Sequence, residues 1–130
     1  PNYAYSLLKQ YKGEWEFDTN WKMIFGHPKK AGWIKAIQEA QQTVQKGLKL
    51  DCPILVISSN KSFPETETWH EEYMTSDIVL DVQDIQKYGE KLGDKVTRDT
   101  IPNGIHDLIL SQKPYRNDAY QTIFEWLKKQ

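Results

Sequence analysis

The residues best suited to acid–base chemistry in this chain are one histidine and one aspartate, His106 and Asp77. His106 follows a Pro-Asn-Gly turn with apolar residues on both sides, and Asp77 follows a long polar loop. A carboxylate that accepts a hydrogen bond from the Nδ1–H of a histidine fixes the tautomer of the ring and leaves Nε2 available as a base. The pair therefore predicts general-base chemistry, although a histidine at such a position can also simply pack in its turn.

Two strand-like segments and one helix-like segment must bring these residues together. Residues 53–57 form a continuous apolar run that is typical of a buried parallel strand. Residues 96–101 carry charged side chains, as an edge strand does, and residues 82–92 between the two runs have helical spacing. Neighbouring parallel strands end at the same edge of a sheet, and the crossover between them is right-handed. We therefore expect an α/β fold in which Asp77 and His106 lie close together.

Two further helices are predicted, one before and one after this unit. Residues 31–46 have apolar side chains at spacings of three and four, and Gly47 ends the segment. Residues 115–129 have a wide apolar face, and Pro114 lies at or just before their start. The order strand, acid, helix, strand, histidine, helix accounts for most of the chain.

The predicted start of the helix at residue 82 gives some of the nearby carboxylates a structural role. Asp81 stands where an N-cap belongs, and Asp84 three positions later gives a capping-box-like pair. Asp77 has no such local role and lies nearer to the end of the preceding strand. Asp77 is therefore the first candidate for the acid that orients His106, with Asp81 as the alternative. Gly104, two residues before His106, is expected to let the chain turn sharply.

Aromatic residues are concentrated near the N-terminus. Half of the 16 aromatic side chains belong to the first quarter of the chain: Tyr3, Tyr5, Tyr11, Trp15, Phe17, Trp21, Phe25 and Trp33. The alternation of Trp15 and Phe17 with acidic residues indicates a short extended segment with one buried face. Such a cluster either lines an apolar ligand pocket or belongs to the hydrophobic core.

Composition argues against several classes of protein. The formal net charge is −1 and no basic cluster is present, which argues against nucleic-acid binding. No apolar run approaches the roughly 20 residues that a membrane span needs, and no signal peptide is visible. The single cysteine, Cys52, permits no internal disulfide, so we expect a cytoplasmic protein in which Cys52 is a small core residue. His70-Glu71 lacks a second histidine at helical spacing, so no metal site and no cofactor are predicted.

Four blocks of the sequence resemble the C-terminal half of an α/β-hydrolase. They are Pro53-Ile-Leu-Val-Ile-Ser, Ser76-Asp-Ile-Val-Leu-Asp-Val, Ile101-Pro-Asn-Gly-Ile-His-Asp-Leu-Ile-Leu-Ser and Phe124-Glu-Trp-Leu. The likeness is closest to the bacterial lysophospholipase-like or serine aminopeptidase-like group. It extends over nearly the whole chain, because Gly13-Glu-Trp-Glu-Phe-Asp and Gly32-Trp-Ile-Lys-Ala-Ile are similar to the region of that group between cap and core.

The resemblance implies a fold, a reaction and two site residues. The fold would be the C-terminal portion of a doubly wound parallel sheet, with a strand-helix-strand-helix core in residues 31–130 and an aromatic-rich, cap-derived segment in residues 1–30. By the matching blocks, Asp77 takes the role of triad acid and His106 that of triad base. The reaction implied is the hydrolysis of carboxylic esters, of lipid or lysophospholipid type, without a cofactor.

The serine nucleophile of that family is not found in the chain. The family's triad runs serine, acid, histidine, with the serine in a Gly-x-Ser-x-Gly turn, and no serine here has glycine two positions away on both sides. The first residue, Pro1, is not a methionine, which indicates a processed or truncated product, and we expect the chain to be inactive alone. Two parallel strands make a poor sheet, so we expect self-association or pairing with a missing half.

Two other functions are open from the sequence. A small α/β module without catalytic activity, which binds a partner or a ligand, is the main alternative. A dehalogenase or epoxide hydrolase with an aspartate nucleophile also has a later acid and histidine, and it comes third. The residues that would precede Pro1 discriminate between these functions, because only the esterase requires a Gly-x-Ser-x-Gly turn there.

Overall fold

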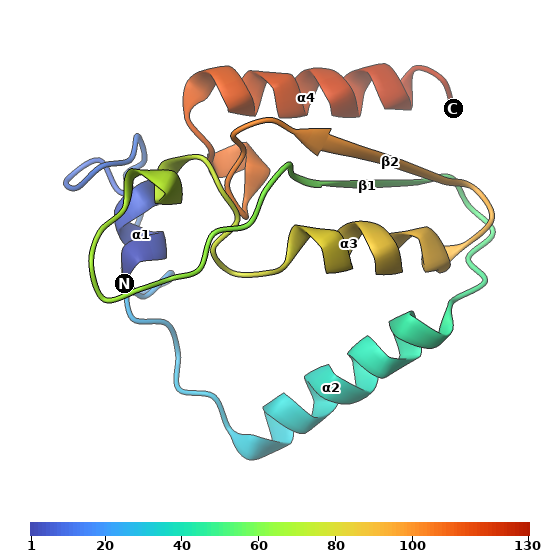
Figure 1. The fold of residues 1–130 in the computed structure, drawn as a ribbon, viewed down its shortest axis with the longest axis horizontal. Coiled ribbons are helices and arrows are strands. Elements are labelled where there is room, and N and C mark those ends of the chain that lie inside the picture. The colour runs from blue at the N-terminus through green and yellow to red at the C-terminus, as the bar shows by residue number, and fades with distance from the viewer.

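The computed structural model describes all 130 residues, Pro1–Gln130, as a mixed α/β fold with four α-helices and a two-stranded parallel sheet. β1 (Ile54–Ser59) pairs with β2 (Val96–Ile101) over its whole length. α3 (Val82–Gly89) lies on one side of the two strands and α4 (Lys113–Leu127) on the other, as Figure 1 shows. The expected order of strand, acid, helix, strand, histidine and helix is confirmed.

β1 continues two residues beyond the predicted end of the strand. Its partner β2 extends to Ile101, and Ser59 is paired with that residue in the register. Ser58 and Ser59 are buried, but their hydroxyl groups donate to the carbonyls of Ser59 and Lys61 at 2.9 and 3.0 Å. Because these hydroxyl groups are paired, the two serines can occupy the buried end of a strand that the sequence predicts to finish at Ile57.

α3 begins at the N-cap that the sequence predicts. The Asp81 carboxylate accepts a hydrogen bond from the backbone N–H of Gln83 at 2.9 Å. The helix packs closely on β1, because a Cβ added to Gly89 would lie 2.7 Å from Val56 Cγ1. The last turn tightens into a 3-10 helix, η2 (Glu90–Leu92), so the predicted helical segment of residues 82–92 is confirmed in two parts.

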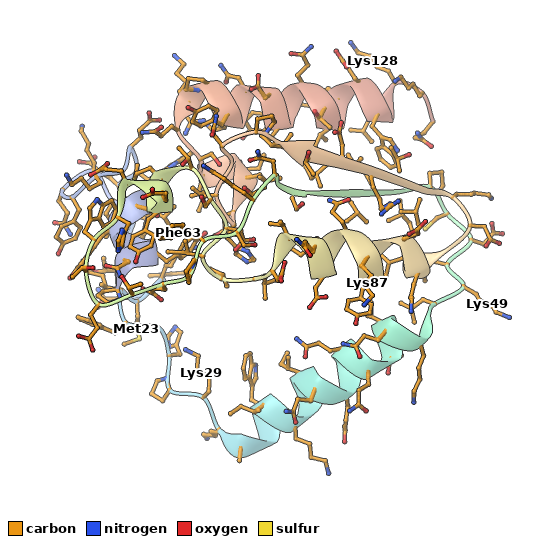
Figure 2. The ribbon with its side chains drawn as sticks, in the orientation of Figure 1. Met23, Lys29, Lys49, Phe63, Lys87 and Lys128 are labelled. Atoms are coloured by element: carbon orange, nitrogen blue, oxygen red, sulfur yellow. The ribbon has the colours of Figure 1, made fainter.

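α2 (Ala31–Lys46) has the predicted bounds, and Gly47 follows it with a φ of 99°, in the region that favours glycine. None of the residues of α2 is buried. Lys91 Nζ of η2 donates to the carbonyl of Gln45 at 2.9 Å, near the end of α2. An apolar pocket of about 530 Å³ lies between α2 and α3, and in Figures 1 and 2 α2 stands apart from the other elements.

α4 begins two residues before the predicted start, with Pro114 inside its first turn, where a missing N–H costs no helical hydrogen bond. Ala119 is fully buried and forms the central core cluster with Ile101 and Leu108. The sequence predicts a wide apolar face on this helix, but the outer part of that face is not buried. The large apolar side chains of that part are exposed to solvent: Tyr120, Phe124 and Leu127.

A second buried group lies where the two strands end. It joins α1 (Asn2–Leu7), which the aromatic pattern did not predict, to the 3-10 helix η1 (Glu71–Met74). Leu7 and Tyr73 are fully buried there, and Leu8 forms an isolated bridge with Trp15. Figure 2 labels Met23 and Phe63 at this end of the molecule. The first residues of the chain therefore pack beside the edge of the sheet at which Asp77 and His106 are expected.

The prediction that Cys52 is buried is wrong. Cys52 is exposed, because it lies in the connector before β1 and not in the strand itself. None of the helices combines the length and the apolar character needed to cross a membrane.

Candidate acid–base site

Asp77 is held by hydrogen bonds of its own backbone and by the backbone N–H groups two and three residues after it. Its N–H donates to the carbonyl of Lys61 at 3.0 Å, and its carbonyl accepts from Phe63 at 2.9 Å. The Asp77 side chain is only 1% exposed, and Oδ1 accepts from the N–H groups of Val79 and Leu80, both at 2.8 Å. These contacts fix the orientation of the carboxylate and leave Oδ2 for another donor.

His106 lies beyond the end of β2, on a turn that the sequence explains only in part. The residue with left-handed backbone geometry is Asn103, with a φ of 59°, and not Gly104. Gly104 is required for a different reason, since a Cβ there would approach Leu108 Cδ2 to 2.5 Å. The residue before His106 is anchored as well, because the N–H of Ile105 donates to Ser111 Oγ at 3.0 Å.

The structure brings Asp77 and His106 together, as the order of elements predicts. His106 Nδ1 lies 2.8 Å from Asp77 Oδ2, and the His106 side chain is 27% exposed. Nε2 of His106 makes no hydrogen bond within the chain. Asp81, the alternative acid, is committed to the N-cap of α3. The geometry is that of a histidine whose tautomer is fixed by a carboxylate and whose second nitrogen can accept a proton.

The electrostatics of the pair favour its charged form. Burial on its own raises the pKa of Asp77, but the hydrogen bonds from His106, Leu80 and Val79 outweigh it and leave the pKa below the ordinary value. For His106, the hydrogen bond to Asp77 raises the pKa and outweighs burial, which acts in the opposite direction. The imidazolium that forms when His106 accepts a proton is therefore stabilised by its neighbour.

A second set of polar contacts lies directly beside the pair and was not predicted. Tyr3 Oη donates to Asp107 Oδ2 at 2.5 Å, and Lys22 Nζ donates to the same oxygen at 3.0 Å. The N–H of Asp107 in turn donates to Tyr3 Oη at 3.2 Å. These residues are far apart in sequence, so no local pattern could identify them.

An open, largely apolar pocket of about 430 Å³ adjoins His106. Its lining combines aliphatic side chains with three charged or polar ones: Ile57, Leu108, Ile109, Leu110, Lys22, His106 and Asp107. A pocket of this character can hold a small apolar group beside the imidazole. The position is the carboxyl edge of the sheet, where ligands bind in α/β folds.

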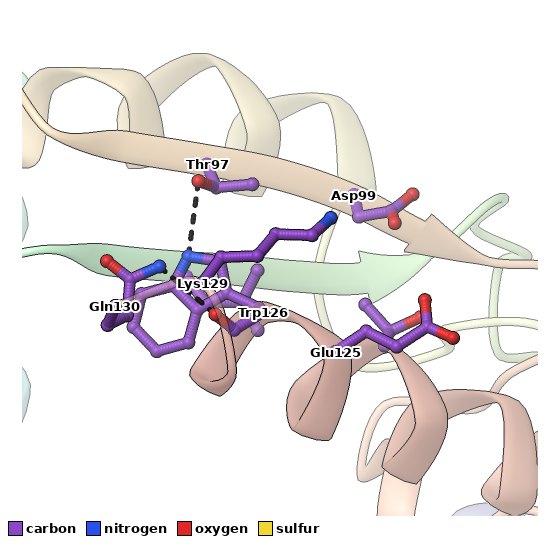
Figure 3. A pocket seen from close by; sticks show the side chains of 8 residues that line it. Thr97, Asp99, Glu125, Trp126, Lys129 and Gln130 are labelled. Atoms are coloured by element: carbon purple, nitrogen blue, oxygen red, sulfur yellow. Dashed lines mark hydrogen bonds between the residues drawn. The ribbon is translucent and has the colours of Figure 1, made fainter.

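A second pocket, of about 400 Å³, lies between β2 and the end of α4 and shares no residue with the first (Figure 3). Its residues are mostly polar, and Trp126 Nε1 donates to Thr97 Oγ1 at 3.2 Å. It contains no histidine, so it offers no group that is suited to act as a base near neutral pH.

Five of the six serine hydroxyl groups are hydrogen-bonded elsewhere in the chain: Ser6, Ser58, Ser59, Ser62 and Ser111. The sixth, Ser76, is buried without a partner. None of the six hydrogen-bonds to His106, so the pair has no serine partner within the chain.

The other two histidines have no comparable acidic partner. His70 packs in an aromatic cluster with Phe63 and Tyr73, and its Nε2 lies 3.3 Å from Thr68 Oγ1. His27 is exposed in an irregular segment before α2. No group of three or more His, Cys, Asp or Glu side chains is arranged so that it could hold a metal ion.

Comparison with protein-family models, with curated proteins and with solved structures finds no match for this chain. The function must therefore be inferred from the site itself.

Proposed function

We propose that the chain carries the acid and the base of a serine hydrolase of the α/β-hydrolase type that acts on carboxylic esters. In this proposal the two-stranded sheet is the C-terminal portion of a larger parallel sheet. His106 removes the proton from a serine hydroxyl through Nε2, and Asp77 orients His106 and stabilises the imidazolium. The observation that carries the proposal is the 2.8 Å contact between His106 Nδ1 and the buried carboxylate of Asp77.

Two further features support an ester with an apolar acyl group as the substrate. The pocket beside His106 has aliphatic walls, with the imidazole at its edge. Lys22, the one cation of that pocket, is already paired with Asp107, so little positive charge is left to attract an anionic substrate. A lipid ester or a lysophospholipid-like ester fits these walls better than a highly charged substrate does.

In this proposal the nucleophilic serine lies outside the 130 residues, and the chain alone is inactive. The test is ester hydrolysis by the longer protein that contains this chain, with a short-chain chromogenic ester as substrate. We expect turnover by the longer protein and none by the chain alone. We also expect a Gly-x-Ser-x-Gly turn upstream of Pro1 in the coding sequence.

The substitution His106→Ala in the longer protein tests the role of the base. Loss of the base leaves binding intact but removes proton transfer, so turnover is expected to fall by about 10³-fold or more. His27→Ala, at an exposed histidine in an irregular segment, is the matched control and should retain activity. Retained turnover in His106→Ala would overturn the proposal.

A non-catalytic binding module is the second candidate, and the apolar pocket between α2 and α3 favours it. That pocket is larger than the one beside His106 and is lined by Ile37, Val44, Ile85, Tyr88 and Leu92, among others. A folded longer protein that hydrolyses no ester and has no upstream nucleophile turn would support this second function.

A further inference from the structure

The carboxylate of Asp107, directly after His106 in the sequence, links three parts of the chain. It accepts from Tyr3 of α1 and from Lys22, which follows the turn at Asp18. Tyr3 and Asp107 are 104 residues apart, and Lys22 and Asp107 are 85 residues apart. The residue next to His106 is therefore hydrogen-bonded to two N-terminal segments that contribute no residue to the Asp77–His106 pair.

Tyr3 also lies against the imidazole, and Lys22 lies over the ring of Tyr3. The Tyr3 ring meets the His106 ring edge-on, with the two centroids 6.1 Å apart and the planes at 75°. Lys22 Nζ lies 5.5 Å from the centroid of the Tyr3 ring. Tyr3 therefore contacts Asp107, Lys22 and the ring of His106.

The ionisation states keep these contacts in place near neutral pH. Burial raises the pKa of Tyr3 far above its ordinary value of 10.0, and the hydrogen bond to Asp107 acts in the same direction, so the hydroxyl group remains a donor. Burial alone raises the pKa of Asp107, but the hydrogen bonds from Tyr3 and Lys22 outweigh it and lower the pKa. Asp107 is therefore an anion with two donors.

We propose that Asp107 is a positioning residue for His106, and that Tyr3 and Lys22 act through it to hold the imidazole against Asp77. His106 is anchored on both sides in sequence, by Ile105 on Ser111 and by Asp107 on the N-terminal segments. Without the second anchor, the turn after β2 can shift. The hydrogen bond from Nδ1 to Asp77 is directional, so it weakens with a small displacement of the ring.

This inference rests on the proposed function for its catalytic meaning, but the hold on His106 can be measured in the chain itself. The charged and titratable groups facing His106 are Asp77, Asp107, Lys22 and Tyr3. Removal of the Lys22 ammonium distinguishes two ways in which Lys22 can act on His106, through its charge alone or by positioning the ring. Its ammonium lowers the pKa of His106, so removal of the charge alone would raise that pKa and leave the Asp77 contact unchanged.

The experiment measures solvent exchange of the His106 Nδ1–H by NMR in the full 130-residue chain and in three variants. The variants are Asp107→Asn, Lys22→Met and Tyr3→Phe, the last of which removes one oxygen and no charge. Positioning predicts exchange that is about tenfold faster in each variant, because the hydrogen bond to a charged acceptor is weakened in all three. Backbone amide spectra establish that each variant is folded, and Tyr3→Phe is the variant that disturbs packing least.

Asp51→Asn is the matched control. It breaks another Lys–Asp ion pair, between Lys95 Nζ and Asp51 Oδ1 at 2.7 Å, which lies on the surface away from the pocket of His106. We expect Asp51→Asn to leave solvent exchange of the His106 Nδ1–H unchanged. Unchanged exchange in Tyr3→Phe and Lys22→Met would overturn the positioning role and leave the esterase proposal standing. Faster exchange in a chain whose longer form hydrolyses no ester would support positioning while the proposed function fails.

Discussion

The edge of the sheet that carries Asp77 and His106 differs from the region around α2 in how its side chains are held. At the edge, Asp77, Ile101 and Ile105 are almost completely buried, and each oxygen of the Asp77 carboxylate has a donor. In α2 no residue is buried, and the apolar side chains on the face toward α3 line an open pocket. In Figure 1 the strands end at the left, beyond the start of α3, and α2 runs below α3.

The difference shows which part of the molecule depends on tertiary contacts. The bounds of α2 are specified locally, by its own periodicity and by Gly47, and none of its residues is buried by neighbouring elements. The acid–base pair instead joins a residue of a long loop to a residue beyond the end of β2, and Tyr3 of α1 lies beside it. Substitutions should therefore be costly at the edge of the sheet and nearly neutral, or even favourable, in α2.

The largest effect is expected for Asp77→Ala. It leaves the N–H groups of Val79 and Leu80 and the imidazole of His106 without their acceptor, so we expect the free energy of unfolding to fall by about 4 kcal/mol. Asp81→Ala removes one exposed N-cap bond and should cost about 1 kcal/mol. Urea denaturation measures both, and equal losses would remove the distinction between a buried acid and a surface cap.

Two glycine substitutions should have opposite signs. Gly104→Ala places a methyl group against the buried Leu108, so the free energy of unfolding should fall by about 2 kcal/mol. Gly32→Ala in α2 places a methyl group in open space and favours the helix, so the free energy of unfolding should rise by about 0.5 kcal/mol. Urea denaturation checks this pair as well, and a loss of stability in Gly32→Ala would contradict the open space around Gly32.

A smaller effect is expected in the pH dependence of stability. The pKa of Asp77 is lowered by folding, so its contribution is present above the ordinary value of 3.8 and is lost as the pH falls. The pKa of His106 is raised by folding, so its contribution is complete below the ordinary value of 6.5 and is lost as the pH rises through the folded value. The difference in unfolding free energy between the wild type and Asp77→Asn should therefore be greatest between pH 3.8 and 6.5. A difference that does not vary with pH would contradict the charged pair.

Much of the framework could be predicted from the sequence because its signals are local. β2 and α2 have the predicted bounds, and Asp81 forms the predicted cap. The end of β1 could not be predicted, since the strand continues only because β2 pairs with it as far as Ser59. α1 is a six-residue helix in which four residues are buried, and no periodicity over so short a segment can reveal it.

The candidate site also contains features that could be predicted from the sequence and features that could not. The pairing of Asp77 with His106 follows from the order of the elements, because parallel strands end at one edge of the sheet. The contacts of Tyr3 and Lys22 with Asp107 join residues too far apart in sequence for any pattern to relate them. Asn103, and not Gly104, has the left-handed backbone, whereas Gly104 is required by its close approach to Leu108, and neither fact can be derived from the sequence of the turn.

The most direct test of the account is an NMR titration of the His106 side chain in the wild-type chain and in Asp77→Asn. We expect the wild-type pKa of His106 to lie above its ordinary value of 6.5, because the Asp77 carboxylate stabilises the imidazolium. In Asp77→Asn that carboxylate is replaced by a neutral amide, and the pKa of His106 should fall to 6.5 or below. A wild-type pKa of His106 below 6.5, or one that Asp77→Asn does not change, would contradict the claim that this carboxylate holds this imidazole.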